Sequence, residues 1–295
     1  MTRLRPMTPR RKPKVPYKVP PSLYRDFRQL LREQLSEDSR FKAQYLGQEF
    51  ESKLIDLDLV EVSDNERRDR AIAKWLHREE LNKATNQRIM FADEEDFLFL
   101  DGRGFPVSAV DVINWCRSTV SSLLGEEIPW DKLSGSFTGG ASTSVKRGVG
   151  SIPKKYQGGT DITEGAIWHY LRLSQSVQPL PRELSVVSGN VMFTVPKTSE
   201  IDRVACKEPE LNMYCQKAVG DYFRRRLKTV GIDLNDQSIN QELARIGSID
   251  GSLATVDLSS ASDSVTKQLV IAIFPFEWSS LLLDLRSPET RIGNE

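Results

Sequence analysis

The amino-acid sequence predicts a helix-rich α+β protein, and three observations support this fold class. The chain has 295 residues, of which 39% are hydrophobic and 28% are charged, as in a globular protein with a polar surface. Several segments repeat apolar residues at the three-to-four-residue spacing of a helix with one buried face. A few shorter segments are apolar, rich in β-branched residues and bounded by Gly, Pro or Ser, which is typical of strands.

The predicted helices are recognised by their apolar spacing and their end residues. Ser108 and Gly125 enclose one of them as N-cap and C-terminal glycine. Another opens at Pro209, a position that proline tolerates, and stops at Gly231. Ser238 and Gln241 form a predicted capping box for a short helix that ends at Gly247. The other predicted helices cover residues 22–54, 66–81 (with Ile72, Trp75 and Leu76 buried), 264–273 and 278–285.

Two strands, a turn and a long loop complete the prediction. The strands cover residues 190–195 and 253–257, and the turn covers residues 101–104. Residues 134–160 are rich in Gly, Ser, Thr and Lys and are too long for a plain connector, which favours a functional loop.

The neutral total charge hides a basic N-terminus. Residues 1–21 hold seven basic residues, no acidic ones and six of the fifteen prolines, so the remainder has 34 basic against 41 acidic residues. The prolines exclude a helix there, and no apolar segment of a signal peptide follows. We expect either a flexible tail or an arm that contacts RNA phosphates.

Spacing excludes several classes of site. The longest apolar run, residues 269–274, has six residues, far fewer than the ~20 of a membrane span. The three cysteines show no C-x-x-C spacing, so neither a disulfide framework nor a zinc cluster is predicted. The two histidines, His77 and His169, are interpreted as surface or half-buried polar residues. The glycines of residues 139–150 match neither a dinucleotide fingerprint nor a P-loop.

A carboxylate, Asp257, stands at the end of the predicted strand 253–257. An ionised carboxylate that leaves the core there needs a cation partner, and a divalent ion with oxygen ligands fits this need. Asp263 lies beyond a Ser-rich turn, where an N-cap is the structural alternative to a functional role. The residues alone leave open whether Asp257 binds a metal.

Three cations lie upstream in sequence between a strand and a helix. Lys197, Arg203 and Lys207 form either a solvated face or a clamp for phosphate groups. A phosphate clamp followed by a strand-end Asp has the parts that Mg²⁺-dependent nucleotidyl transfer requires.

The segments that contain these residues resemble one family. Residues 195–227 (VPKTSEIDRVACKEPELNMYCQKAVGDYFRRRL), 231–266 and 281–288 (LLLDLRSP) are similar to the replicase subunit of single-stranded RNA bacteriophages, the Qβ-like RNA-directed RNA polymerases. Weaker similarity extends upstream through residues 137–143 to about residue 85, and the first 80 residues show none.

The resemblance implies a right-hand polymerase fold that is truncated here to the fingers and the first strand–helix unit of the palm. Residues 1–21 would be the tail, 22–250 an N-terminal and fingers region with the triphosphate-binding motif, and 251–295 the start of the palm. The chain would copy single-stranded RNA by nucleotidyl transfer.

The resemblance also implies roles for five residues. ATVDLSSASD matches palm motif A, which makes Asp257 a ligand of the catalytic Mg²⁺ ions. Ser262 and Asp263 fall near the position that senses the ribose 2′-OH, and either of them would do so. PKTSEIDR matches the fingers motif that holds the incoming triphosphate, which assigns Lys197 and Arg203 to triphosphate binding. Asp202 and Lys207 receive no role.

One departure from the family concerns the second metal-binding motif. The family places a Gly-Asp-Asp turn downstream of motif A, and this sequence has no Asp-Asp pair. We therefore expect an incomplete replicase that is inactive by itself. The alternative is a catalytically inert fragment that binds RNA or a host protein.

The resemblance extends to partners and location. It implies template and product RNA, nucleoside triphosphates and, in Qβ-like phages, the host elongation factors Tu and Ts and a ribosomal small-subunit protein. No membrane association is expected, and the implied location is the cytoplasm of the infected bacterium.

Overall fold

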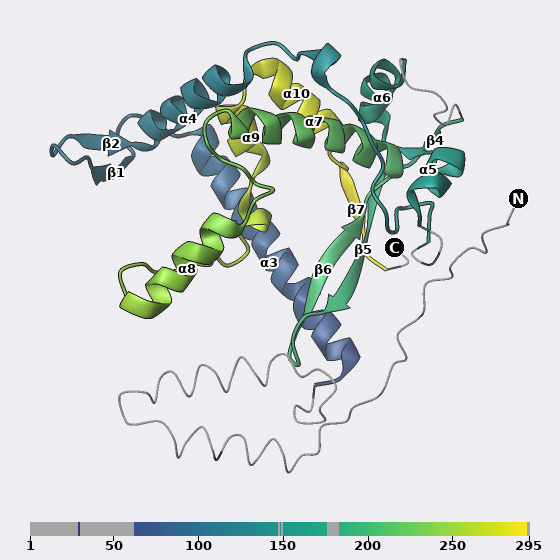
Figure 1. Cartoon of the computed structure of the whole chain (residues 1–295), viewed down its shortest axis with the longest axis horizontal. Helices are drawn as coiled ribbons and strands as arrows, with labels where there is room; N and C mark the ends of the chain where they lie inside the picture. The colour runs from purple at the N-terminus through teal and green to yellow at the C-terminus, as the bar shows by residue number, and fades with distance from the viewer. Residues whose placement is uncertain (1–28, 30–61, 147, 149, 176–182, 294–295) are drawn as a thin grey trace, which may run out of the picture. The chain divides into compact units, whose positions relative to one another are not determined.

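The structure is a computed structural model that describes residues 29, 62–146, 148, 150–175 and 183–293 (Figure 1). The chain divides into two compact units. The first unit consists of Met1–Ala71 and Thr194–Arg203, and the second of Ile72–Phe193 and Val204–Glu295. The predicted tail and, apart from Gln29, the predicted helix 22–54 lie outside the described residues. The predicted boundaries after residues 21 and 250 stay a prediction.

Most helices lie where their sequence pattern predicts. The α-helices of the described residues are α3 (Asp64–Met90), α4 (Ala109–Leu124), α5 (Ile152–Gly158), α6 (Ile167–Ser174), α7 (Glu210–Lys228), α8 (Ser238–Asp250), α9 (Lys267–Ile273) and α10 (Phe276–Leu285). The 3₁₀ helices are η2 (Trp130–Lys132), η4 (Glu164–Ala166) and η5 (Ser262–Ser264). The predicted ends of α4 are confirmed: Ser108 is its N-cap, in a capping box with Asp111, and Gly125 follows its last turn at a φ of 82°. The predicted start of α7 at Pro209 is confirmed.

Three predictions about helices are wrong in detail. The Ser238 side chain does not cap α8, because the N-cap residue is Gln237 and Ser238 is already the first helical residue. α8 continues past Gly247 to Gly251, which adopts the left-handed conformation that favours glycine. In α3 the predicted apolar face is only partly buried: Ile72 and Trp75 are half-buried, whereas Leu76 is 47% exposed.

The strands of the described residues form three small sheets, which together with the helices confirm a helix-rich α+β protein. The strands are β1 (Phe97–Leu100), β2 (Pro106–Ser108), β3 (Asp161–Ile162), β4 (Ser185–Val186), β5 (Gly189–Pro196), β6 (Asp202–Lys207) and β7 (Glu289–Arg291). β1 and β2 form an antiparallel hairpin around the predicted turn 101–104, and β3 pairs with β4 in parallel. The third sheet has the order β6-β5-β7, with β5 and β7 parallel. β5 confirms the predicted strand 190–195.

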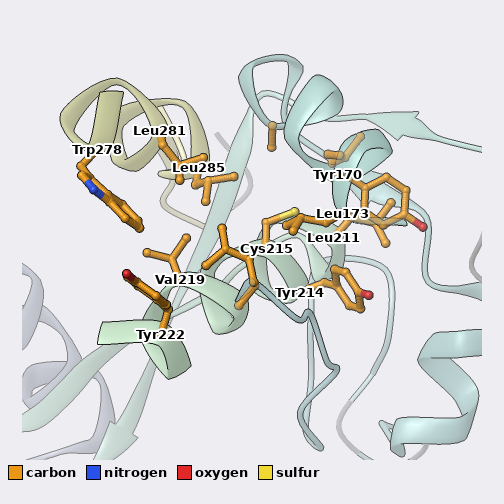
Figure 2. Packing of buried hydrophobic residues seen from close by; sticks show 14 of the residues in the cluster. Tyr170, Leu173, Leu211, Tyr214, Cys215, Val219, Tyr222, Trp278, Leu281 and Leu285 are labelled. Atoms are coloured by element: carbon orange, nitrogen blue, oxygen red, sulfur yellow. The ribbon is translucent and has the colours of Figure 1, made fainter. Parts of the chain in front are cut away.

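The core of the second unit surrounds α7, the helix that contributes the largest share of its buried residues (Figure 2). Trp278, Leu281 and Leu285 from α10 approach one side of α7, and Tyr170 and Leu173 from α6 approach another. The Trp278 ring stacks on Tyr222 at a centroid distance of 5.4 Å, and its Nε1 donates to the Gly125 carbonyl at 3.0 Å. A continuous apolar core therefore fixes α7, from whose N-terminus the chain leads back to β6.

Burial of Cys215 in this core makes stability depend on alkaline pH. Burial raises the pKa of the Cys215 thiol from 9.0 to about 12. Because the unfolded chain loses this proton first, the free energy of unfolding falls as pH rises from about 9 towards 12. We expect Cys215 to account for a loss of about 2 kcal/mol at pH 11 relative to pH 8.

Denaturant unfolding at pH 8 and 11 checks this prediction. Cys215→Ala should lose less stability between the two pH values than the unsubstituted chain. Cys116→Ala, at a half-buried cysteine, is the matched control. An unchanged pH dependence in Cys215→Ala would contradict it.

Candidate functional site

The segment that resembles palm motif A is exposed and irregular, so the predicted strand 253–257 is wrong. All five of its residues are exposed, and Val256 is 81% exposed. In the part of the chain that the structure describes, no strand pairs with this segment. An isolated strand leaves its backbone N–H and C=O groups without partners, and these groups are then solvated instead. Val256 and Leu258 are consequently not anchored in a core.

The Asp257 carboxylate is exposed and forms no hydrogen bond or ion pair with the described residues. It is therefore an oxygen donor of the type that Mg²⁺ prefers. No group of three or more His, Cys, Asp or Glu residues that could hold a metal ion occurs in the described parts of the chain. The chemistry of Asp257 fits a magnesium ligand, but the described residues do not complete a ligand set.

The turn after Asp257 is held by the C-terminal half of α3. Ser260 has a φ of 56°, which reverses the chain ahead of η5. Asn82 Nδ2 donates to the Asp263 carbonyl at 2.7 Å, and Asn86 Oδ1 accepts the Gln268 backbone N–H at 2.9 Å. The position of α3 therefore sets the position of the turn.

Ser262 and Asp263, the predicted ribose sensors, are both exposed in η5. Their side chains lie 3.4 Å apart (Ser262 Oγ to Asp263 Oδ1). Asp263 is not a helix N-cap, because Thr266 has this role: its hydroxyl accepts the Leu269 N–H at the start of α9. Neither side chain caps α9.

The segment that resembles the triphosphate-binding motif forms the turn between β5 and β6. The Thr198 N–H donates to the Ile201 carbonyl at 3.0 Å, and the Thr198 hydroxyl accepts the Ile201 N–H at 3.2 Å. Lys197 precedes this turn and Arg203 follows it, and both are exposed. Neither side chain has a hydrogen bond or ion pair to the described residues. Both cations are therefore available to a ligand.

The five predicted site residues belong to different units. Lys197 and Arg203 lie in the first unit, whereas Asp257, Ser262 and Asp263 lie in the second. The structure brings Lys197 and Arg203 to one turn, and Asp257, Ser262 and Asp263 lie within seven residues of each other along the chain.

Sequence reasoning missed the partner of Asp202. Arg67 Nε, in the first turn of α3, lies 3.5 Å from Asp202 Oδ1, and each side chain is only 10% exposed. The predictive signal was absent, because Arg67 lies in a segment with no similarity to the family motifs. Lys207, the third cation of the predicted clamp, instead lies over the Phe193 ring at 5.4 Å.

The predicted long loop 134–160 is not irregular throughout, because it contains the short helix α5, and it packs on the start of α7. The Thr143 N–H donates to the Glu208 carbonyl at 3.2 Å, and the Ser144 hydroxyl bonds to the Glu210 carboxylate. The Asp161 N–H donates to Glu210 Oε1 at 3.0 Å. Glu210 and Lys155 are both fully buried. These contacts give the loop a structural role, and its predicted functional role stays a prediction.

Two of the family-like segments contact each other directly. Asn212 Nδ2 and Gln216 Nε2, both on α7, donate to the Leu285 carbonyl at 3.1 and 2.8 Å. The Ser287 hydroxyl donates to Glu208 Oε2 at 2.6 Å. The polar residues of these two segments therefore join α7 to the end of α10.

His169 is half-buried, which agrees with its interpretation from the sequence as a surface or half-buried polar residue. Its Nε2 lies 2.8 Å from Asp284 Oδ2, and its ring stacks on Trp130.

Among the described residues, no helix has the length and apolar character that crossing a bilayer requires.

Comparison with known proteins identifies the family. The family model of the RNA replicase beta-chain matches residues 22–295. The chain is 59% identical over 121 residues to the RNA-directed RNA polymerase beta chain of Escherichia phage MS2, which covers 41% of this chain and 21% of the relative. It is 36% identical over 257 residues to the RNA-directed RNA polymerase subunit beta of Escherichia virus Qbeta, which covers 85% of this chain and 41% of the relative.

A third relative, the RNA-directed RNA polymerase beta chain of Enterobacteria phage fr, is 49% identical over 160 residues, or 51% of this chain and 29% of the relative. The chain thus spans between about a fifth and two fifths of the length of these relatives. The match of the family model over residues 22–295 shows that the chain belongs to the RNA replicase beta-chain family.

Proposed function

We propose that this chain provides the triphosphate-binding turn and the first catalytic carboxylate of an RNA-directed RNA polymerase. The observation that carries the proposal is the exposed Asp257 carboxylate, which no described side chain neutralises, in a segment that matches palm motif A of the family. In this proposal the chain forms the fingers and the start of the palm of a right-hand polymerase.

Each site residue has a proposed task in this reaction. Lys197 and Arg203 bind the triphosphate of the incoming nucleotide, since two exposed cations on one turn neutralise phosphate charge. Ser262 or Asp263 contacts the ribose 2′-OH. Asp257 supplies one carboxylate ligand for Mg²⁺.

The proposed magnesium site requires further ligands. When bound, Mg²⁺ would stabilise the charge that develops as the 3′-OH of the growing RNA displaces pyrophosphate. Two-metal catalysis uses carboxylates from more than one segment. We therefore propose that the other ligands come from a segment outside residues 62–293, as a Gly-Asp-Asp turn would supply.

Further proposals concern partners and location. The substrates would be template RNA and nucleoside triphosphates, and the location would be the cytoplasm of an infected bacterium. Host elongation factors Tu and Ts and a ribosomal small-subunit protein are proposed as partners by family resemblance alone. No observation favours the alternative of an inert binding fragment.

A fusion protein tests the proposed function. In the Qbeta relative, the matched region is replaced by this chain, and template-dependent incorporation of nucleotides is measured. We expect incorporation that requires RNA, all four nucleotides and Mg²⁺. The intact Qbeta relative, purified in parallel, is the positive control. A folded fusion that incorporates no nucleotide while this control is active would contradict the proposal.

A further inference from the structure

The triphosphate-binding turn proposed above carries two acidic residues beside its two cations. Residues 197–203 include Lys197 and Arg203 but also Glu200 and Asp202, so the turn has no net charge. Asp202 and Arg203 are consecutive residues of β6, so their side chains leave the strand on opposite faces, but an Asp202 carboxylate that turned outward would compete with a phosphate for the Arg203 guanidinium. The turn therefore needs another cation that holds Asp202.

We infer that Arg67 is a positioning residue that holds Asp202 and thereby keeps Arg203 and Lys197 available for a triphosphate. Arg67 Nε lies 3.5 Å from Asp202 Oδ1, and both side chains are 10% exposed. All of these residues belong to the first unit. This inference rests on the proposed function of Lys197 and Arg203.

Arg67 itself is fixed by its place in α3. Ser63 and Glu66 form reciprocal hydrogen bonds at the helix start: the Glu66 carboxylate accepts the Ser63 N–H and O–H, and the Ser63 hydroxyl accepts the Glu66 N–H. One end of the Arg67 guanidinium donates to the Val62 carbonyl at 3.1 Å and the other pairs with Asp64. A guanidinium bound at two ends presents its remaining Nε–H in one direction. The Nε atom lies 3.5 Å from Asp202 Oδ1 without forming a hydrogen bond, so Arg67 and Asp202 interact as a nearly buried pair of opposite charges.

A second arginine of α3 strengthens the attachment of the turn. Arg70 Nη1 lies 3.4 Å from the Glu200 carbonyl, which is at the tip between Lys197 and Arg203. The first two turns of α3 therefore contact the β5–β6 turn at two points. Side chains at a binding site are effective when neighbouring residues lock them in place.

Hydrogen exchange of the 295-residue chain tests the positioning role without a ligand. We expect Arg67→Met to speed amide exchange of residues 194–203 about tenfold, because it leaves a buried carboxylate without a cation. Arg68→Met changes the same charge on the next, exposed residue of α3 and should have no effect. Arg67→Lys keeps the charge and should restore part of the protection. Unchanged exchange in Arg67→Met would overturn the inference.

Binding of ATP, measured by calorimetry on the same variants, links the turn to function. We expect Lys197→Met and Arg203→Met to weaken ATP binding directly, and Arg67→Met to weaken it about tenfold through Asp202. In Arg67→Met combined with Asp202→Asn, the competing carboxylate is gone, so binding should recover.

The outcomes separate the two claims. If Lys197→Met weakens ATP binding but Arg67→Met does not, the positioning role is overturned and the proposed function stands. If the unsubstituted chain binds no ATP, or if Lys197→Met and Arg203→Met bind it normally, the proposed role of the turn fails, and the positioning role fails with it.

Discussion

Asp257→Asn is expected to reduce RNA synthesis by the Qbeta fusion about a thousandfold. The amide keeps the size and shape of the carboxylate but has no negative charge, so it is a poor ligand for Mg²⁺. The charge stabilisation that a metal ion gives a transition state is worth several kcal/mol, and about 4 kcal/mol corresponds to roughly a thousandfold in rate. The initial rate of nucleotide incorporation at saturating template and nucleotide measures this loss.

Asp250→Asn is the matched control for this experiment. Asp250 is also exposed and lies seven residues before Asp257, at the end of α8, where its carboxylate accepts the Ser252 N–H at 2.9 Å. It has no proposed role in catalysis, so Asp250→Asn should retain the rate of the fusion. An Asp257→Asn fusion as active as the Asp250→Asn fusion would show that Asp257 is not a metal ligand.

The helices were predictable from the sequence where local signals and burial agree. α4 has a capping residue, an apolar face and a terminal glycine, and the core residues of α7 and α10 recur at helical spacing. The strand predicted at residues 253–257 failed because a strand depends on a partner, which local sequence does not reveal. The same segment is apolar and β-branched but exposed in the structure.

The candidate site was predictable only as a set of residues. Family resemblance identified Asp257, Lys197 and Arg203, since these stand in long motifs. It gave no signal for Arg67, whose partner Asp202 lies 135 positions away along the chain. The environment of Lys155 was equally invisible, because its burial depends on how the loop 134–160 packs against α7. Long-range charge pairs of this kind follow from tertiary structure and not from local pattern.

Lys155 and Glu210 form a buried pair of opposite charges that should be important for stability. Both residues are 0% exposed. Burial lowers the pKa of the Lys155 amine, and the negative charge of Glu210 opposes this shift. Lys155 Nζ and Glu210 Oε2 have no hydrogen-bond partner among the described residues, so the pair interacts through charge. The end of α5 packs closely on Glu210, because a Cβ on Gly159 would lie 2.7 Å from Glu210 Cγ.

Lys155→Met is therefore expected to lower the free energy of unfolding by about 3 kcal/mol, because it leaves the Glu210 carboxylate buried without a cation. Glu210→Gln keeps an acceptor for the Ser144 hydroxyl and the Asp161 N–H and should cost less, because an unpaired buried lysine can lose its proton. The folded state of Glu210→Gln then binds fewer protons than the unfolded state, so its deficit relative to the unsubstituted chain should shrink as pH rises from 7 towards 10.

Denaturant unfolding of both single variants and of the double variant measures this coupling. The double variant has no buried charge at this position, and we expect it to be more stable than Lys155→Met alone. Lys154→Met, at the exposed neighbouring lysine of α5, is the matched control and should change stability by less than about 0.5 kcal/mol. Additive losses in the double variant would mean that Lys155 and Glu210 do not compensate each other. In that case the Lys155 charge would not help to hold the loop to the start of α7. The contacts that do so would be the hydrogen bonds at residue 210 and the aromatic packing of Phe137 on Tyr156 and Tyr214.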